Sequence, residues 1–147
     1  MNEEEPHYLL DSNIISEIIK PDADFNVMKK IAEHSSDCAI CAPVWEEMMF
    51  GAKILPQGVS RKFLEDFLIN DVHENFPIKS YTEKAALIHA ELRAALKKKG
   101  MPTQKTDSLI ASIALANHMV LVTRNTKHFE AIQEVSELKV ENWFTIR

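Results

Sequence analysis

The sequence has little glycine and no long apolar run. Only three of its 147 residues are glycine and six are proline, which excludes collagen-like, linker-rich and low-complexity classes. No apolar run approaches the roughly 20 residues that a membrane-spanning helix needs, and no internal repeat indicates a solenoid. The first residues, MNEEEPH, are acidic and polar rather than apolar. We therefore expect no secretory signal, no membrane association and a cytoplasmic location.

The chain also lacks an excess of basic residues. It has 17 lysines and arginines against 22 aspartates and glutamates, a formal net charge of -5. Domains that bind the nucleic-acid backbone electrostatically are usually basic, so this charge balance argues against nonspecific nucleic-acid binding. It does not exclude a nuclease, because divalent cations bound to acidic residues reverse the local charge. The length predicts a single domain over residues 1–147, with residues 1–6 as a short acidic N-terminal extension.

Cysteine is scarce as well, with Cys38 and Cys41 in the segment CAIC as the two examples. Their spacing is found in redox and zinc sites. However, the segment DCAICAP is typical of a short buried strand, and residues three apart on a strand point to opposite faces. No second Cys-x-x-Cys pair completes a zinc site. We predict two buried, reduced cysteines.

Strand and helix signals alternate along the chain. This alternation predicts an α/β fold with three layers, in which a mostly parallel central sheet is flanked by helices. Ser12 or Asn13 is expected to cap the first helix, and Thr106 a later one. Strands are predicted at 8–11, 38–41, 119–123 and within 138–143, with a short edge strand near Pro77. Helices are predicted after residue 12 to Lys20, around 25–32, from Pro43 onward, around 63–68, at 82–99 and at 107–118.

Three acidic residues are candidates for a functional site. Asp11 follows the first strand, where ligands of parallel sheets bind. Glu47 lies on the helix face that carries Val44, Met48 and Gly51, whereas the neighbouring Glu46 is the solvent-facing candidate. Asp107 precedes an almost wholly apolar helix, where an unpaired carboxylate is unfavourable. Each acid alone is also typical of a turn or a helix N-terminus. Together they are hard oxygen ligands that suit Mg²⁺ or Mn²⁺.

Four motifs carry a resemblance to a known family. YLLDSN, APVWEEMMFGA, KTDSLIASIALA and LVTRNTKHF occur in the order and spacing of the PIN-domain ribonucleases, and the chain is most similar to the VapC type. The resemblance extends from Tyr8 to Trp143 and includes LKVENW. It implies a metal-dependent endoribonuclease, the toxin of a type II toxin–antitoxin pair. It also implies a homodimer, a cognate antitoxin that covers the site with a peptide, and products with 5′-phosphate and 3′-hydroxyl ends.

The resemblance implies roles for individual residues. Asp11 matches the first acid of the family, Glu47 the glutamate four residues before Gly51, and Asp107 the third acid. These three are expected to be catalytic and to hold Mg²⁺ or Mn²⁺. Asn125 stands where many members have a fourth acid and is expected to position a water, but it carries no charge for a second metal ion.

Other polar residues are expected to support this site. Ser12 stands where the family more often has threonine, and Thr123 matches a second hydroxyl position. Arg124 and Lys105 neighbour site residues in sequence and are predicted to bind RNA. Lys97–Lys99 end the long helix, where favourable interaction with the helix dipole is the simpler interpretation. His89 is interpreted as a partly buried structural histidine.

Two other interpretations stay open from the sequence. A phosphoaspartyl protein would also have an aspartate after its first strand, but Asn13 stands where a dehalogenase has its second aspartate. A receiver domain would need an acidic pair before the first strand and a lysine where Arg124 stands. The second alternative is a non-catalytic PIN-fold module that binds RNA or protein. Loss of the acids would favour that module, and three of the four are present.

Overall fold

A parallel sheet forms the centre of the structure, a computed structural model that describes residues 7–145. The predicted extension, residues 1–6, lies outside the described residues. The sheet has five strands within the described part, in the order β3-β2-β1-β4-β5. Tyr8 is paired with Cys38 on one side and with Val120 on the other, and every strand pair is parallel. The strands are β1 Tyr8–Leu10, β2 Cys38–Cys41, β3 Ile78–Lys79, β4 Val120–Val122 and β5 Val140–Glu141.

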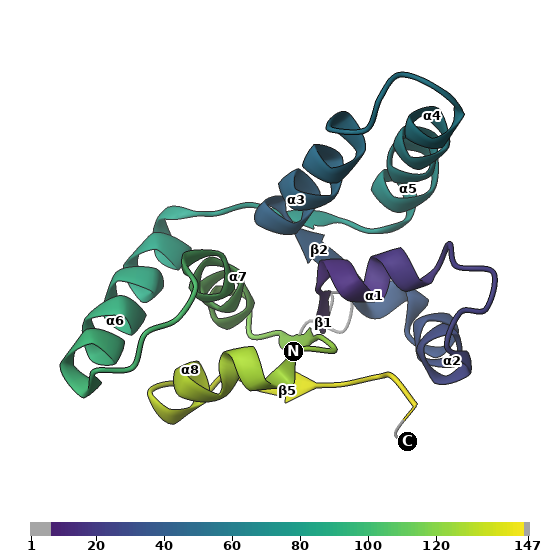
Figure 1. Cartoon of the computed structure of the whole chain (residues 1–147). Coiled ribbons are helices and arrows are strands. Elements are labelled where there is room, and N and C mark those ends of the chain that lie inside the picture. Colours follow the sequence, from purple (N-terminus) through teal and green to yellow (C-terminus); the bar gives the residue numbers. More distant parts are fainter. Residues whose placement is uncertain (1–6, 146–147) are drawn as a thin grey trace.

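Helices cover both faces of this sheet, and the predicted three-layer α/β class is confirmed. In Figure 1, α6, α7 and α8 lie on one side of the strands, and α1 and α2 lie on the other. Parallel strands require such crossover connections. No described helix is both long and apolar enough to cross a membrane. The helices are α1 Ser12–Glu17, α2 Phe25–Glu33, α3 Ala42–Lys53, α4 Val59–Asp66, α5 His73–Asn75, α6 Glu83–Lys99, α7 Lys105–Ala116 and α8 Glu130–Glu134.

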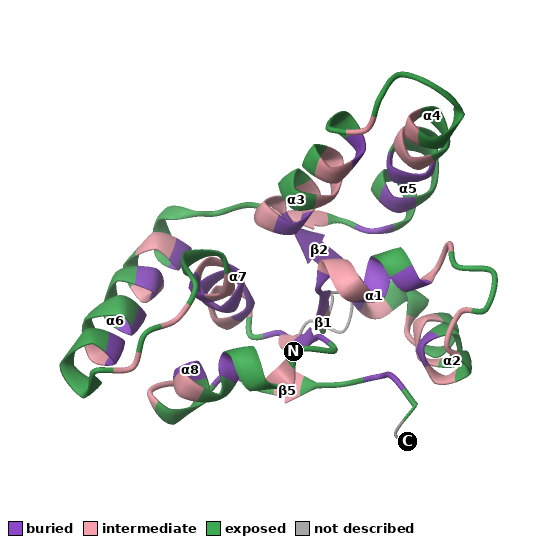
Figure 2. Cartoon of the chain, viewed as in Figure 1, coloured by how far each residue is buried: buried purple, intermediate pink, exposed green. Residues whose placement is uncertain are grey.

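The core lies between the strands and the helices on either face. All four residues of β2 are buried, and so are six of the twelve residues of α7 (Figure 2). Leu9, Leu10, Leu121 and Val122 are also fully buried. A parallel sheet covered on both faces has continuous apolar strands rather than alternating ones. This burial fixes β1 beside β4, so the residues that follow these two strands meet at one edge of the sheet.

The prediction that Ser12 or Asn13 caps the first helix is wrong. Asp11 is the N-cap of α1, in an extended conformation, and its side chain accepts a hydrogen bond from the Ser12 N–H. Ser12 therefore begins the helix instead of capping it. Aspartate caps helices as well as serine does, and Asp11 leaves the strand already extended. The chain thus passes from β1 to α1 at this carboxylate without an intervening loop.

The cap predicted for α7 is also wrong. Gln104 is the N-cap, although its side chain makes no capping hydrogen bond, and the helix begins at Lys105. The Ser108 N–H donates to the Gln104 carbonyl at 3.2 Å, which extends the helix backward beyond Thr106. As a result, Thr106 and Asp107 lie in the first turn of α7.

The segment between α3 and β3 departs most from prediction. A helix was expected around Phe63–Leu68, but α4 begins earlier, at Val59, and continues as a π-helical segment, Phe67–Val72. The short 3-10 segments elsewhere are Ser35–Asp37 and Thr126–Phe129. The predicted edge strand exists, but it begins after Pro77, whose carbonyl accepts a hydrogen bond from the Ile40 N–H. Proline lacks an N–H and is therefore tolerated at this margin.

The predictions for α6 and for the cysteines are confirmed. Thr82 caps α6 by accepting a hydrogen bond of 3.1 Å from the Ala85 N–H. Gly100 follows the helix with a φ of 66°, the left-handed conformation that glycine adopts most readily. Cys38 and Cys41 are free and buried in β2.

Candidate active site

Asp11 lies where β1 ends, at the carboxyl-terminal edge of the sheet. Its backbone N–H donates to the Val122 carbonyl at 2.9 Å, which holds it beside the end of β4. Its carboxylate accepts hydrogen bonds of 2.8 Å from the Ser12 N–H and from the Thr123 hydroxyl. The Asn13 amide nitrogen lies 3.4 Å from the same carboxylate. Asp11 is only 8% exposed, and these donors satisfy a charge that would otherwise be unfavourable to bury.

Glu47 comes to the same edge on α3. The Ser12 hydroxyl donates a hydrogen bond of 2.8 Å to Oε2 of Glu47 and so joins α1 to α3 across 35 residues of sequence. Pro43 lies at the start of α3, directly after β2, where proline is well tolerated. Glu47 follows Pro43 by about one helical turn and lines the cavity described below. Glu46, its neighbour, does not line the cavity described below.

Asp107 reaches the site from the first turn of α7. Its side chain is 17% exposed, and its Oδ2 lies 3.8 Å from Nδ1 of His128. Burial raises the pKa of Asp107 above its usual value; His128 opposes this effect, whereas Asp11 and Glu47 add to it. The three carboxylates therefore repel one another at Asp107, and a cation among them would relieve that repulsion.

The residues after β4 complete the edge. Thr123 is fully buried, and its hydroxyl oxygen accepts hydrogen bonds from the Asn125 N–H at 3.1 Å and from the Asn13 amide at 3.2 Å. Asn13 in turn accepts the Arg124 N–H at 3.0 Å. Since Thr123 also donates to Asp11, a continuous hydrogen-bond network connects the start of α1 with the chain that follows β4.

These segments enclose one polar cavity of about 340 Å³. We call it the carboxylate cavity. It lies beyond the carboxyl ends of β1 and β4, the place where ligands of open parallel sheets bind. Larger cavities exist elsewhere in the described structure, so chemistry rather than size marks this one. It is lined by Asp11, Ser12, Asn13, Ser16, Glu47, Thr106, Asp107, Ile110, Asn125 and His128.

Two residues predicted to bind RNA do not line the carboxylate cavity. Arg124 is exposed, and its guanidinium carbon lies 4.4 Å from the ring centroid of Phe144. Lys105 lines a different cavity, on another side of the first turn of α7. Thr123 lies beneath the cavity and acts on it through Asp11.

Several residues of this cavity were not assigned to it from the sequence. Asn13 was considered as a possible helix cap and in comparison with other families, but not as a site residue, yet it contacts Asp11 and Thr123. Its position in the first turn of a helix that begins after a buried acid was a usable signal. His128 was not assigned to the site from the sequence, and it faces Asp107. For Ser16, one helical turn after Ser12, the signal was helical spacing, since residues four apart share a helix face.

The donor set of this cavity consists of hard oxygen atoms. Within residues 7–145, no three His, Cys, Asp or Glu side chains form a group that could hold a metal ion by themselves. Mg²⁺ does not require such a group, because it usually keeps several waters and is bound through one or two carboxylates. The oxygens that line the cavity fit that mode of binding.

Comparison with known proteins agrees with this architecture. Residues 8–135 match the family model of the PIN domain. The chain is 32% identical over 139 residues to ribonuclease VapC2 of Rickettsia felis, covering 92% of this chain and 97% of that protein. It is similar to the crystal structure of FitAcB from Neisseria gonorrhoeae, with a TM-score of 0.82, 27% identity and coverage of 92% of this chain and 96% of that one.

A third similarity is to the crystal structure of VapBC2 from Rickettsia felis bound to a DNA fragment from their promoter. Its TM-score is 0.74 at 26% identity, and the alignment covers 92% of this chain and 98% of that chain. The family model spans the segments that carry Asp11, Glu47, Asp107 and Asn125. The chain therefore belongs to the PIN domain family and has VapC ribonucleases among its relatives.

Proposed function

We propose that this protein is an endoribonuclease that hydrolyses RNA phosphodiester bonds with the help of Mg²⁺ or Mn²⁺. One observation carries the proposal: Asp11, Glu47 and Asp107, from three separate segments, line the same cavity beyond the carboxyl ends of the parallel strands. Family membership and a ribonuclease relative support it. We assign catalytic roles to these three acids and to Asn125.

A divalent cation suits the charge of this cavity. Asp11, Glu47 and Asp107 would hold it, directly or through water, and their mutual repulsion at Asp107 would then be relieved. A bound cation would lower the pKa of a water and neutralise charge that develops on the phosphate. Asn125 supplies an amide instead of a fourth carboxylate, so a single principal ion is the expected arrangement.

The residues around the acids keep them in position. Thr123 orients Asp11 with its hydroxyl, and the Ser12 hydroxyl orients Glu47. Both acceptors are thus aimed before substrate arrives, which limits the reorganisation that catalysis requires. Asn125 lines the cavity with a neutral amide that can donate to a water or to a phosphate oxygen.

We further propose that the protein is the toxin of a type II toxin–antitoxin pair, with a cognate antitoxin as partner. The similarity to the VapBC2 structure supports this pairing. A peptide of the antitoxin laid over the carboxylate cavity would block access of RNA to the acids. The expected homodimer, cytoplasmic location and single domain stay predictions. The alternative of a non-catalytic binding module is not favoured, since the chain retains the three acids and resembles a ribonuclease.

Purified protein incubated with total RNA tests the nuclease proposal. We expect cleavage with Mg²⁺, no cleavage with EDTA, and products that carry 5′-phosphate ends. Asp11→Asn should abolish cleavage. Cleavage that persists both in EDTA and in the Asp11→Asn variant would refute the metal mechanism.

Two adjacent glutamates on α3 offer a matched control. Glu47→Gln removes a charge from the carboxylate cavity, whereas Glu46→Gln removes the same charge from a residue that does not line it. We expect a loss of at least about a hundredfold in cleavage rate for Glu47→Gln, within the range that positioned catalytic groups contribute, and no change for Glu46→Gln. Equal effects of the two substitutions would argue against Glu47 as a site residue.

A further inference from the structure

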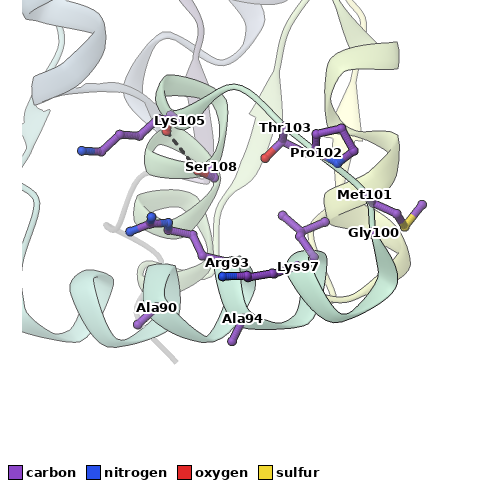
Figure 3. A pocket seen from close by; sticks show the side chains of 11 residues that line it. Ala90, Arg93, Ala94, Lys97, Gly100, Met101, Pro102, Thr103, Lys105 and Ser108 are labelled. Carbon is purple, nitrogen blue, oxygen red and sulfur yellow. Dashed lines mark hydrogen bonds between the residues drawn. The ribbon is translucent and has the colours of Figure 1, made fainter.

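A second cavity lies beside the first, between α6 and the start of α7. Its volume is about 720 Å³, within the range of ligand sites in proteins. We call it the basic cavity, because Arg93, Lys97 and Lys105 line it and none of its lining residues in the described structure is acidic. The side chains of these three cations extend toward the same side (Figure 3). The chain as a whole has a net charge of -5, so this local concentration of positive charge indicates a binding site for an anionic ligand.

These cations lack anionic partners within residues 7–145. Other cations in that range do form ion pairs, among them Lys20, Lys53, Arg61 and Lys62. The three cations of the basic cavity form none. Arg93 and Lys105 also act together on a neighbour: after burial, which is the main cause, their charges lower the pKa of His89. A common positive field therefore exists where α6 meets α7.

The dipole interpretation of the lysines at the end of α6 accounts for only part of this arrangement. Lys97, Lys98 and Lys99 all lie in the last turn of the helix, where positive charge is favourable. Only Lys97 of the three lines the basic cavity. Arg93 lies one turn before Lys97, outside the last turn. The dipole thus explains three lysines at the helix end but does not explain a cavity lined by three cations.

The basic and carboxylate cavities share the first turn of α7. Lys105 and Ser108 line the basic cavity, while Thr106 and Asp107 line the carboxylate cavity. A polymer that crosses this turn would contact both. The basic cavity also has apolar walls, to which Met101 and Pro102 contribute. Cations for phosphate together with apolar surface for a base or ribose are what a bound single strand requires.

We propose that the basic cavity binds a nucleotide of the RNA substrate that flanks the scissile phosphate, with Arg93, Lys97 and Lys105 contacting backbone phosphate. This inference rests on the proposed function for the identity of the ligand as RNA. The cavity holds the strand across the first turn of α7 and compensates for the repulsion between RNA phosphates and the carboxylates. It supplies affinity from a surface outside the carboxylate cavity.

Salt-dependent binding tests this assignment. The probe is a fluorescent single-stranded RNA oligonucleotide, measured by anisotropy with full-length Asp11→Asn protein in Mg²⁺, because we expect this variant not to cleave RNA. Removal of one cation that binds phosphate should reduce the slope of log Kobs against log salt by about 0.7. The double variant Arg93→Gln, Lys97→Gln should therefore lower the slope by roughly 1.4 and the affinity by about tenfold or more at ~0.1 M salt. Lys105→Gln should lower the slope by about 0.7.

The matched control is the double variant Lys98→Gln, Lys99→Gln, which removes the same charge from the same helix, at residues that do not line the basic cavity. It should bind RNA with the same slope as the parent protein. Equal losses in both double variants would indicate a nonspecific charge effect and would overturn the proposal. So would unchanged RNA binding in the Arg93, Lys97 variant. If that variant lost binding to a polyglutamate peptide instead, the cavity would belong to an acidic protein segment.

The nuclease proposal and the basic-cavity proposal fail separately. Cleavage is measured with the unsubstituted acids, and binding is measured without cleavage. A protein that never cleaves RNA but loses RNA binding in the Arg93, Lys97 variant alone would refute the nuclease and support the cavity. A protein that cleaves RNA while this variant retains full affinity and slope would do the reverse. Because both residues are exposed on α6, glutamine should leave folding intact, and thermal unfolding of each variant checks this.

Discussion

The hydroxyl of Thr123 donates a hydrogen bond of 2.8 Å to Oδ2 of Asp11, although 112 residues separate them in sequence. The bond joins the ends of two neighbouring parallel strands, β1 and β4. Both partners are buried, and the same hydroxyl accepts the Asn125 N–H. Thr123 therefore connects the carboxylate of Asp11 to the backbone of Asn125.

Replacing Thr123 with valine keeps its shape and removes its hydroxyl. We expect the free energy of unfolding to fall by about 1–3 kcal/mol, the range for leaving buried polar partners unsatisfied. RNA cleavage should fall at least tenfold because Asp11 loses its orienting donor. Thr123→Ser keeps the hydroxyl and should lose only about 0.8 kcal/mol for one buried methyl group, with cleavage retained. Chemical denaturation and cleavage rates measure both; a valine variant as stable and active as the parent would contradict the role of this hydroxyl.

A second buried network predicts a dependence of stability on pH. His89 is 4% exposed; its Nδ1 lies 3.2 Å from the Tyr81 hydroxyl and its Nε2 lies 2.7 Å from the Ser108 hydroxyl. Ser108 donates its own proton to the Lys105 carbonyl, so it accepts the Nε2–H of a neutral His89, and Tyr81 donates to Nδ1. Burial, followed by the charges of Arg93 and Lys105, lowers the pKa of His89 below its usual 6.5.

The unfolded chain therefore takes up a proton at His89 before the folded chain does. Stability contributed by neutral His89 is fully present above pH 6.5 and is lost as pH falls below that value toward the lowered pKa. Relative to a His89→Gln variant, the wild-type free energy of unfolding should fall by at most about 1.4 kcal/mol per pH unit in that window. Denaturant titrations over a series of pH values measure the difference. Parallel curves for the two proteins would exclude a neutral, buried His89.

The raised pKa of Asp107 predicts that Mg²⁺ reverses the order of stability of wild type and the Asp107→Asn variant. Because the pKa of Asp107 in the folded chain is raised above 3.8, ionisation of this carboxylate destabilises the folded chain. The destabilisation grows as pH rises from 3.8 through the raised pKa. Without a divalent cation, Asp107→Asn should thus be more stable than wild type at neutral pH, and the difference should vanish below pH 3.8. With Mg²⁺ at about a hundred times its Kd, wild type should gain about 2.7 kcal/mol. The variant should gain much less, and thermal unfolding with and without Mg²⁺ would show the crossing.

The outcome that contradicts the proposed cation site is simple to recognise. Mg²⁺ that stabilises Asp107→Asn and wild type equally acts elsewhere on the protein. The Glu46→Gln variant is the control, because it should retain the full Mg²⁺ response. If Mg²⁺ does not stabilise the wild-type protein at all, the proposed metal-dependent mechanism is wrong.

The two cysteines should be chemically inert in the folded protein. Burial raises the pKa of each thiol, Cys38 and Cys41, to about 12, and the thiolate is the reactive form. A maleimide or disulfide reagent at mildly alkaline pH should modify neither in the native state and both in denaturant. The double variant Cys38→Ala, Cys41→Ala should keep RNA cleavage. Rapid native labelling, or activity lost without unfolding, would support a redox role instead.

Local signals predicted much of this fold. The buried strands were recognisable as short apolar runs, and the helix expected at 82–99 is α6, Glu83–Lys99. These features depend on residues close together in sequence. The π-helical segment Phe67–Val72 was not predicted, because apolar spacing alone does not distinguish it from an α-helix. The start of α7 was missed since Gln104 makes no side-chain cap.

The site was also predicted in part. Asp11, Glu47, Asp107 and Asn125 were selected in sequence, and all four line one cavity. Their catalytic and metal-binding roles stay predictions. Their hydrogen-bond partners were less accessible to sequence reasoning. Asn13 was not assigned to the network, and nothing in KKK, residues 97–99, indicated that only Lys97 faces the basic cavity.

The sequence by itself determined which strands are buried, where the acids stand relative to them, and which family the motifs resemble, because burial patterns and chain order are local properties. Only the tertiary structure decided that Ser12 holds Glu47, that Thr123 holds Asp11, and that two cavities of opposite charge share the first turn of α7. Such relationships depend on how strands and helices distant in sequence pack, and packing sets distances that no single segment specifies.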